Sequence, residues 1–89
     1  MQVRRSKRVI CKRRASLVIK LECNPERVPC LLLDSSLEGF RVLGICRLQR
    51  GQVVELIPDE NLFNSSRCRV IWVGKVGSEQ EGQVGLECA

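Results

Sequence analysis

Apolar side chains recur at every second position through most of the chain, which is the period of a β-strand and not of a helix. The alternation is clearest in residues 16–23, where one face collects the side chains of Leu17, Ile19, Leu21 and Cys23. No segment shows the three-to-four-residue spacing of an amphipathic helix. The pattern therefore predicts an all-β fold.

Six short strands follow from the same pattern, separated by turns rich in Gly, Pro and Asn. The expected strands are residues 16–23, 28–34, 39–44, 52–57, 67–74 and 82–89. Residues 28–34 are apolar on both faces, which predicts a strand that is covered on both sides. Strands that recur about every ten residues favour an antiparallel barrel or sandwich, and a barrel leaves no exposed strand edge. We expect a six-stranded antiparallel β-barrel without a C-terminal helix.

Charge is distributed unevenly along the 89 residues, which suffice for a single domain. Residues 1–20 hold eight Lys or Arg and no acid, whereas the remaining 69 hold seven basic and ten acidic residues. We expect residues 1–14 to form a flexible basic N-terminal arm and residues 15–89 to form the barrel domain. A basic arm favours an anionic partner, although a solvated, disordered tail also accounts for it.

The six cysteines are at least seven residues apart and the chain has no histidine, so the local spacings of zinc sites are missing. We expect no metal and no cofactor. Cys23, Cys30, Cys68 and Cys88 lie in strand-like runs, which predicts reduced thiols buried as small apolar groups. The chain has no histidine and no nucleophile motif, so it lacks the residues that most often perform general acid–base and nucleophilic catalysis. The composition indicates a binding module and not an enzyme.

No apolar run is long enough for a membrane span, and the basic N-terminus lacks the apolar stretch of a signal peptide. The default expectation is a cytoplasmic protein that does not contact a membrane.

Two motifs contain candidate ligand-binding residues. Arg4 and Arg8 form R-x-x-x-R, and guanidinium groups match both phosphate oxygens and the O6/N7 edge of guanine. The stretch Asp34-Ser35-Ser36-Leu37-Glu38-Gly39 offers a carboxylate for guanine N–H groups, a hydroxyl, and a glycine that allows close approach or a positive φ. A turn closed by side-chain hydrogen bonds explains the second motif equally well.

Together, R-x-x-x-R followed by [D/N]-x-S-x-x-G, with strands around both motifs, resembles the signature of the PilZ family. The resemblance implies a six-stranded barrel that binds the bacterial second messenger cyclic di-GMP. It implies that Arg4 and Arg8 contact phosphates and guanine edges, and that Arg5 adds a stacking or phosphate contact. Asp34, Ser36 and Gly39 would form the site on the barrel. Trp72 would lie beneath the ligand, or would fill the barrel core.

The resemblance implies a receptor that changes conformation on binding and regulates motility, exopolysaccharide synthesis or secretion through a downstream protein or a fused domain. We expect the arm to be disordered until it closes over the ligand. Two alternatives stay open. One is a PilZ-like protein-interaction module that binds no nucleotide. The other is a small basic barrel that binds nucleic acid, which is disfavoured because the barrel is net acidic and lacks aromatic platforms.

Overall fold

The computed structural model describes residues 9–44, 47–60 and 64–88, and these residues form six strands. The strands are β1 (Val9–Ile19), β2 (Glu26–Ser35), β3 (Gly39–Leu43), β4 (Val53–Pro58), β5 (Ser66–Val73) and β6 (Gln83–Cys88). The expected all-β architecture is thus confirmed. Among the described residues there is no helix with the length and hydrophobicity that crossing a lipid bilayer would require.

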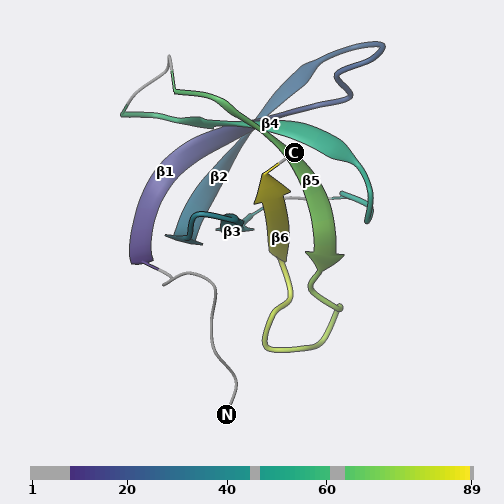
Figure 1. The fold of residues 1–89 in the computed structure, drawn as a ribbon. Coiled ribbons are helices and arrows are strands. Elements are labelled where there is room, and N and C mark those ends of the chain that lie inside the picture. The colour runs from purple at the N-terminus through teal and green to yellow at the C-terminus, as the bar shows by residue number, and fades with distance from the viewer. Residues whose placement is uncertain (1–8, 45–46, 61–63, 89) are drawn as a thin grey trace.

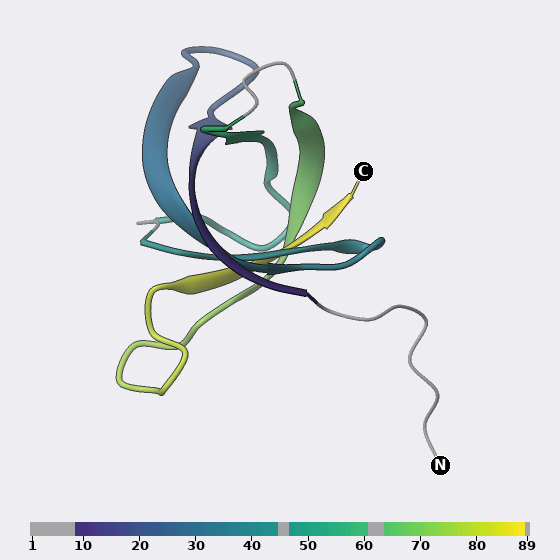
Figure 2. The same cartoon turned by 90° about the vertical axis from the view of Figure 1, so that its left-hand side faces the viewer.

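The six strands form a closed antiparallel barrel in the order β1-β2-β3-β6-β5-β4 (Figure 1). The first three strands follow one another as hairpins, and β4 then pairs with β1 on the opposite edge. β5 and β6 continue from β4 and close the barrel against β3. Figure 2 looks into the curved sheet and shows the start of β1 on the same side as the β2–β3 hairpin.

The barrel interior is aliphatic and contains no aromatic residue that is fully buried among the described residues. Its largest fully buried side chains are Leu17, Leu56, Leu86, Val42, Val54, Val70 and Val84. Leu48, in the connection between β3 and β4, also belongs to this core. Alternate residues of each strand supply it, as the period-two pattern requires. The core therefore fixes which side chains of each strand point outward.

β1 begins at Val9, well before the expected start at residue 16, so residues 9–14 belong to the barrel wall and not to an arm. The long strand β2 supplies the backbone partners for this extension. The register shifts at a bulge between Ile10 and Arg13, where Lys12 adopts a φ of 50°. Charged side chains did not prevent a strand here because Lys12, Arg13 and Arg14 are exposed to solvent.

Two further expectations need correction. Cys30 and Cys68 are buried as predicted, but Cys23 lies exposed in the turn after β1 and Cys88 is exposed at the end of β6. β2 is not covered on both sides, because its buried residues alternate with half-buried ones up to Ser35. Its apolar outer face is therefore a partly exposed surface of the barrel.

Candidate functional site

Four residues of the candidate region line up across neighbouring strands of the barrel. Asp34 on β2 is the direct partner of Arg41 on β3, Arg41 of Gly85 on β6, and Gly85 of Trp72 on β5. Directly opposed residues of antiparallel strands project from the same face. Because the neighbouring Val42 and Leu86 point into the core, this row lies on the outer face.

The carboxylate of Asp34 is buried, with 3% of the residue exposed, and it forms an ion pair with Arg41. The Nη2 atom of Arg41 lies 2.6 Å from Oδ2 of Asp34. A buried charge is tolerated only when it is paired, so the pair fixes the orientation of the acid. Sequence reasoning missed Arg41, although its alternation with Val42 already placed it on the outer face.

Two buried polar atoms on this face have no hydrogen-bond partner among the described residues, namely Nε of Arg41 and Oε1 of Gln83. Gln83 is two positions before Gly85 on β6, and both therefore project from the same face. One atom is a donor and the other an acceptor. Buried polar atoms without a partner are uncommon and call for an explanation such as a bound molecule.

Ser36 closes the turn between β2 and β3. Its N–H donates to the carbonyl oxygen of Gly39 at 2.9 Å, and its Oγ accepts the N–H of Glu38 at 3.3 Å. This is a turn closed by a side-chain hydrogen bond, which is the second explanation that the sequence allowed for this motif. A hydroxyl has one donor and two acceptor positions, so the turn uses only part of the hydrogen-bonding capacity of Ser36.

Gly39 is required by strand packing. A Cβ at this position would overlap the carbonyl oxygen of Leu86 and lie 3.0 Å from its carbonyl carbon. Gly39 has no positive φ, so of the two reasons expected for a glycine here, a positive φ does not apply. The close approach allowed by this glycine is to β6, and it brings the turn next to the end of that strand.

Trp72 lies on the outer face of the barrel, so of the two places expected for it, the indole does not fill the core. A bulge between Val70 and Trp72 shifts the register and moves the indole outward. A Cβ on Gly85 would overlap the indole nitrogen, so the ring lies directly over this glycine. A glycine inside a strand is a signal of such close approach, and it was available in the sequence.

Arg4, Arg5 and Arg8 lie outside the described residues. The backbone nevertheless fixes where this segment joins the barrel, because Val9 pairs with Ser35 and Ile10 with Asp34. Arg8 is bonded directly to Val9, and consecutive Cα atoms are about 3.8 Å apart. The first described residue, Val9, therefore lies beside the D-x-S-x-x-G motif, where the start of β1 adjoins the end of β2 (Figure 1).

A family model for the PilZ domain matches residues 2–89. The chain belongs to the PilZ domain family. A search of curated proteins finds no match to it. PilZ domains in general are binding modules for cyclic di-GMP and not enzymes, in agreement with the composition. Of the residues that carry the family motifs, Asp34, Ser36 and Gly39 lie at this corner of the barrel, and Val9, the residue after Arg8, pairs with Ser35 there.

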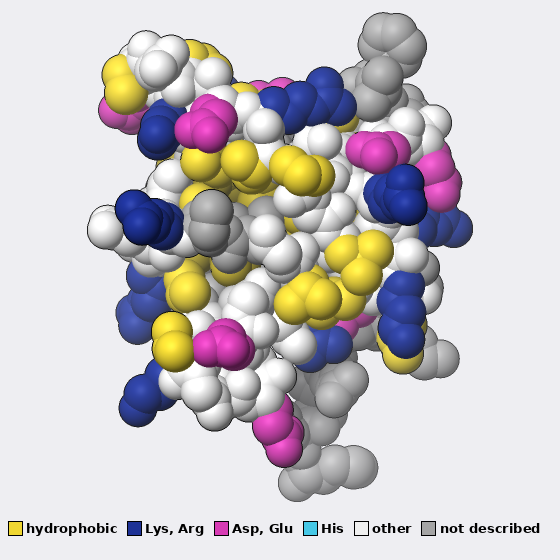
Figure 3. Space-filling view, turned by 180° about the vertical axis from the view of Figure 1, so that it is seen from behind, with side chains coloured by type: hydrophobic (Ala, Val, Ile, Leu, Met, Phe, Trp, Pro, Cys, Tyr) yellow, Lys and Arg dark blue, Asp and Glu magenta, His cyan; other side chains and the backbone are white. Residues whose placement is uncertain are grey.

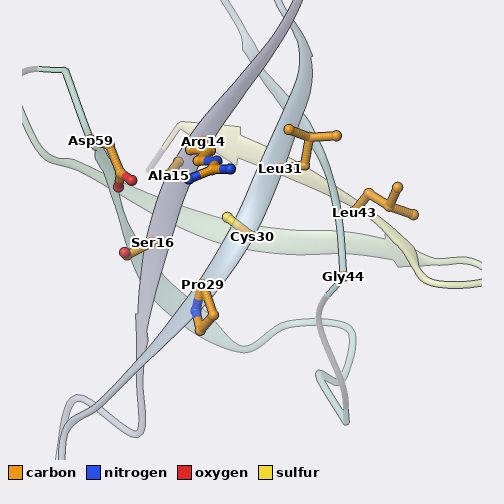
Figure 4. Close-up of a pocket in the computed structure, with 9 residues that line it drawn as sticks. All are labelled: Arg14, Ala15, Ser16, Pro29, Cys30, Leu31, Leu43, Gly44 and Asp59. Atoms are coloured by element: carbon orange, nitrogen blue, oxygen red, sulfur yellow. The ribbon is translucent and has the colours of Figure 1, made fainter.

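Two cavities of this PilZ domain, both lined by described residues, lie away from the row that contains Asp34 and Arg41. One of about 550 Å³ is lined by residues of β1 and β2, by the end of β3 and by Asp59 (Figure 4). Cys30 lines it, but burial and the nearby charge of Asp59 raise the pKa of this thiol to about 11. A thiol that stays protonated at neutral pH is a poor nucleophile, so this cavity has no activated cysteine.

A second cavity, of about 670 Å³, lies at the opposite end of β1 and is lined in part by Lys20, Arg67 and Arg69. In the described part of the chain no cluster of three or more His, Cys, Asp or Glu is arranged to hold a metal ion.

Figure 3 shows one face of the barrel, where basic side chains lie mostly at the margins, with apolar and acidic side chains between them. That face presents no continuous basic surface.

Proposed function

We propose that this PilZ domain binds cyclic di-GMP between its N-terminal arginines and the outer face around Asp34. The observation that supports this most directly is the pairing of Val9 with Ser35, which joins the arginine segment to the barrel beside the second motif. Had β1 started on the far side of the barrel, the two motifs would have been separated by its full width.

Each motif supplies a different part of the proposed contact. Arg4 and Arg8 bind the phosphates and the O6/N7 edge of guanine, and Arg5 adds a phosphate or stacking contact. On the barrel, the carboxylate of Asp34, which is ion-paired with Arg41, accepts hydrogen bonds from guanine N–H groups. Ser36 contributes its hydroxyl, Gly39 holds the turn against β6, and Trp72 offers an apolar ring to the base.

Ligand binding would order the segment before Val9. Residues 1–8 hold four basic side chains and no acid, so they repel one another until the two phosphates of the ligand neutralise part of the charge. Closure would create a new surface beside the β2–β3 turn. A downstream protein or a fused domain would recognise this surface and regulate motility, exopolysaccharide synthesis or secretion. We place this activity in the bacterial cytoplasm, where thiols are kept reduced.

Isothermal titration calorimetry with cyclic di-GMP tests the proposal on the wild type, Arg8→Ala and Asp34→Asn. We expect both variants to lose at least tenfold in affinity, because each removes a charge-assisted hydrogen bond worth roughly 1.5–3 kcal/mol. Arg27→Ala is the matched control, since Arg27 is exposed on β2 at the far end of the strand and faces Val18. Circular dichroism checks that each variant is folded.

Wild-type protein that releases no heat with cyclic di-GMP contradicts the proposal and favours the protein-interaction alternative. Binding of generic RNA or DNA with steep salt dependence, and no preference for the cyclic dinucleotide, favours the nucleic-acid alternative. An Arg27→Ala variant that loses as much affinity as Arg8→Ala also contradicts the proposed site, because it would show a diffuse charge effect.

A further inference from the structure

Two cysteines face each other across the last strand pair of the barrel. Cys68 on β5 is the direct register partner of Cys88 on β6. Directly opposed residues in antiparallel strands project from the same face and have neighbouring Cβ atoms. The pair was not visible in the sequence, because twenty positions separate the two residues and only the strand register brings them together.

The backbone hydrogen bonds show which type of pair this is. The N–H of Cys88 donates to the carbonyl oxygen of Glu38 at 2.9 Å, so the backbone of Cys88 faces β3 and not β5. On β5, Val70 bonds to Gly51 and Gln52 on the β4 side, and Cys68 has the same orientation two positions earlier. Neither cysteine therefore exchanges backbone hydrogen bonds with the other.

In such non-hydrogen-bonded pairs the Cα atoms are about 4.5 Å apart and the side chains are at their closest. Disulfides span Cα separations of about 4.4–6.8 Å. The two thiols can therefore be joined without moving the strands apart.

We propose that Cys68 and Cys88 form a thiol-oxidation site, which a peroxide-class oxidant converts into a cross-strand disulfide. Cys88 is exposed and meets the oxidant, whereas Cys68 is fully buried. The sulfur of Cys88 takes one oxygen from the peroxide, giving a sulfenic acid and water. The thiol of Cys68 then displaces the hydroxyl group, which leaves as a second water, and the S–S bond forms. In total the two thiols lose two hydrogens and the peroxide is reduced to water.

The environment of Cys68 agrees with this division of roles. Its Sγ lies 3.5 Å from the carbonyl oxygen of Ser66, to which the S–H donates. Burial and the nearby Cys88 raise the pKa of the Cys68 thiol to about 12. Cys68 therefore stays protonated near neutral pH and does not compete for the oxidant, which leaves Cys88 as the residue that reacts first. The attack of Cys68 on the sulfenic acid requires the loss of this proton, so we expect this second step to be the slow one and to become faster as pH rises.

Oxidation at this site has a direct connection to the motif turn. The residue that is modified, Cys88, donates its N–H to Glu38, and its neighbour Glu87 pairs with Gly39. A disulfide would tie this end of β6 to β5 and hold the turn more firmly. The formation of the disulfide does not depend on nucleotide binding, so its test is independent of the proposed function.

The test treats the reduced, folded chain with hydrogen peroxide and follows it by intact-mass and peptide analysis. We expect the mass to fall by two hydrogens and two thiols to be lost. Trypsin cleaves after Lys and Arg, so the disulfide would link the dipeptide Cys68-Arg69 to the peptide that begins at Val76. The thermal midpoint should rise, and dithiothreitol should reverse both changes.

Cys88→Ser should abolish the mass loss, and Cys23→Ser is the matched control that should retain it, because Cys23 is also exposed but lies in a turn after β1. Cys68→Ala tests the buried partner, and the exposed position of Cys88 keeps the test valid if that variant does not fold. Oxygen addition to Cys88 without a link to Cys68 overturns the proposal. A disulfide that survives in Cys88→Ser does so as well.

Discussion

The guanidinium group of Arg41 holds the carboxylate of Asp34 on the outer face of the barrel, with 2.6 Å between Nη2 and Oδ2. This places the acid of the D-x-S-x-x-G motif in an ion pair that joins β2 to β3. Asp34 therefore has two roles that need to be separated, one in the barrel wall and one in the proposed ligand contact.

A double-mutant cycle separates them. Arg41→Gln should reduce the free energy of unfolding by about 2 kcal/mol, below the roughly 3–5 kcal/mol of a fully buried pair because the Arg41 side chain is 38% exposed. Adding Asp34→Asn should recover part of this loss, since it removes the buried charge that Arg41 no longer pairs. Urea denaturation of the four proteins measures the coupling, and strictly additive effects would contradict it.

Ser36→Ala should weaken cyclic di-GMP binding beyond its effect on stability. The chain offers a matched control in Ser78, whose Oγ accepts the N–H of Gln80 at 3.2 Å in a similar turn. Each variant should lose about 0.5–1.5 kcal/mol of folding free energy per turn hydrogen bond that it removes. Ser78→Ala should cost more, because the hydroxyl of Ser78 also donates to the carbonyl oxygen of Lys75 at 2.6 Å. Calorimetry should show weaker binding for Ser36→Ala alone. Equal affinities in the two variants would remove Ser36 from the site.

Gly39→Ala should be more harmful than alanine at a glycine with a positive φ. Gly51 has a φ of 90° and open space around its Cα, so Gly51→Ala costs about 1–2 kcal/mol through backbone strain alone. At Gly39 the new methyl group collides with the backbone of Leu86, which has to move. Thermal denaturation ranks the two variants, and a milder effect at Gly39 would argue against the tight β3–β6 contact.

Trp72 provides a spectroscopic test because it is the single tryptophan of the chain. Its ring lies over Gly85 on the face that carries Asp34 and Arg41. Adding cyclic di-GMP should change the intensity or wavelength of its emission as the base excludes water from the ring. Gly85→Ala should shift the emission of the free protein, since the added methyl group displaces the indole. Emission that is unchanged at saturating ligand would exclude Trp72 from the contact.

Alkaline pH should destabilise the barrel through its buried thiols. The pKa values of Cys30 and Cys68 are raised from 9.0 to about 11 and about 12. Between pH 9 and these values the unfolded chain loses thiol protons that the folded chain keeps, so the free energy of unfolding falls as pH rises. The loss should be on the order of 1–2 kcal/mol per thiol at about pH 10.5.

Urea denaturation at about pH 8 and about pH 10.5 checks this, with Cys68→Val as the comparison. The variant should show a smaller fall in stability between the two pH values than the wild type, because it lacks one of the two thiols. An identical fall in both proteins would assign the effect to other titrating groups.

The sequence predicted the strands well because each has one aliphatic face that must be buried. Leu17, Val42, Val54, Val70 and Leu86 all occupy the core, as alternation requires. The period of two breaks at three bulges, between Ile10 and Arg13, between Leu32 and Asp34, and between Val70 and Trp72. The bulge before Trp72 moves the indole to the outer face, whereas strict alternation from Val70 would place it in the core. The strand character of residues 9–14 was hidden by exposed charges that do not oppose backbone pairing.

The candidate site was predicted only in part. Its motif residues can be recognised from spacing, but Arg41 and Gly85 enter through pairing between strands that are distant in the sequence. The glycine inside the last strand was the one local signal of this arrangement. Three further features become visible only when the strand register is known, because composition and periodicity do not show which residues face each other. They are the Asp34–Arg41 ion pair, the unpartnered Nε of Arg41 and the Cys68–Cys88 pair.

The strand order has a consequence for how the protein is made. β3 pairs with β6, so the row that starts at Asp34 and Arg41 is completed by Gly85, near the end of the chain. During synthesis on a ribosome the motif turn therefore emerges long before the strand against which Gly39 packs. Pairings between distant segments also form slowly. Until β6 arrives, a nascent chain presents the edge of β3 to solvent, and chaperones that recognise unpaired strands have that interval in which to act.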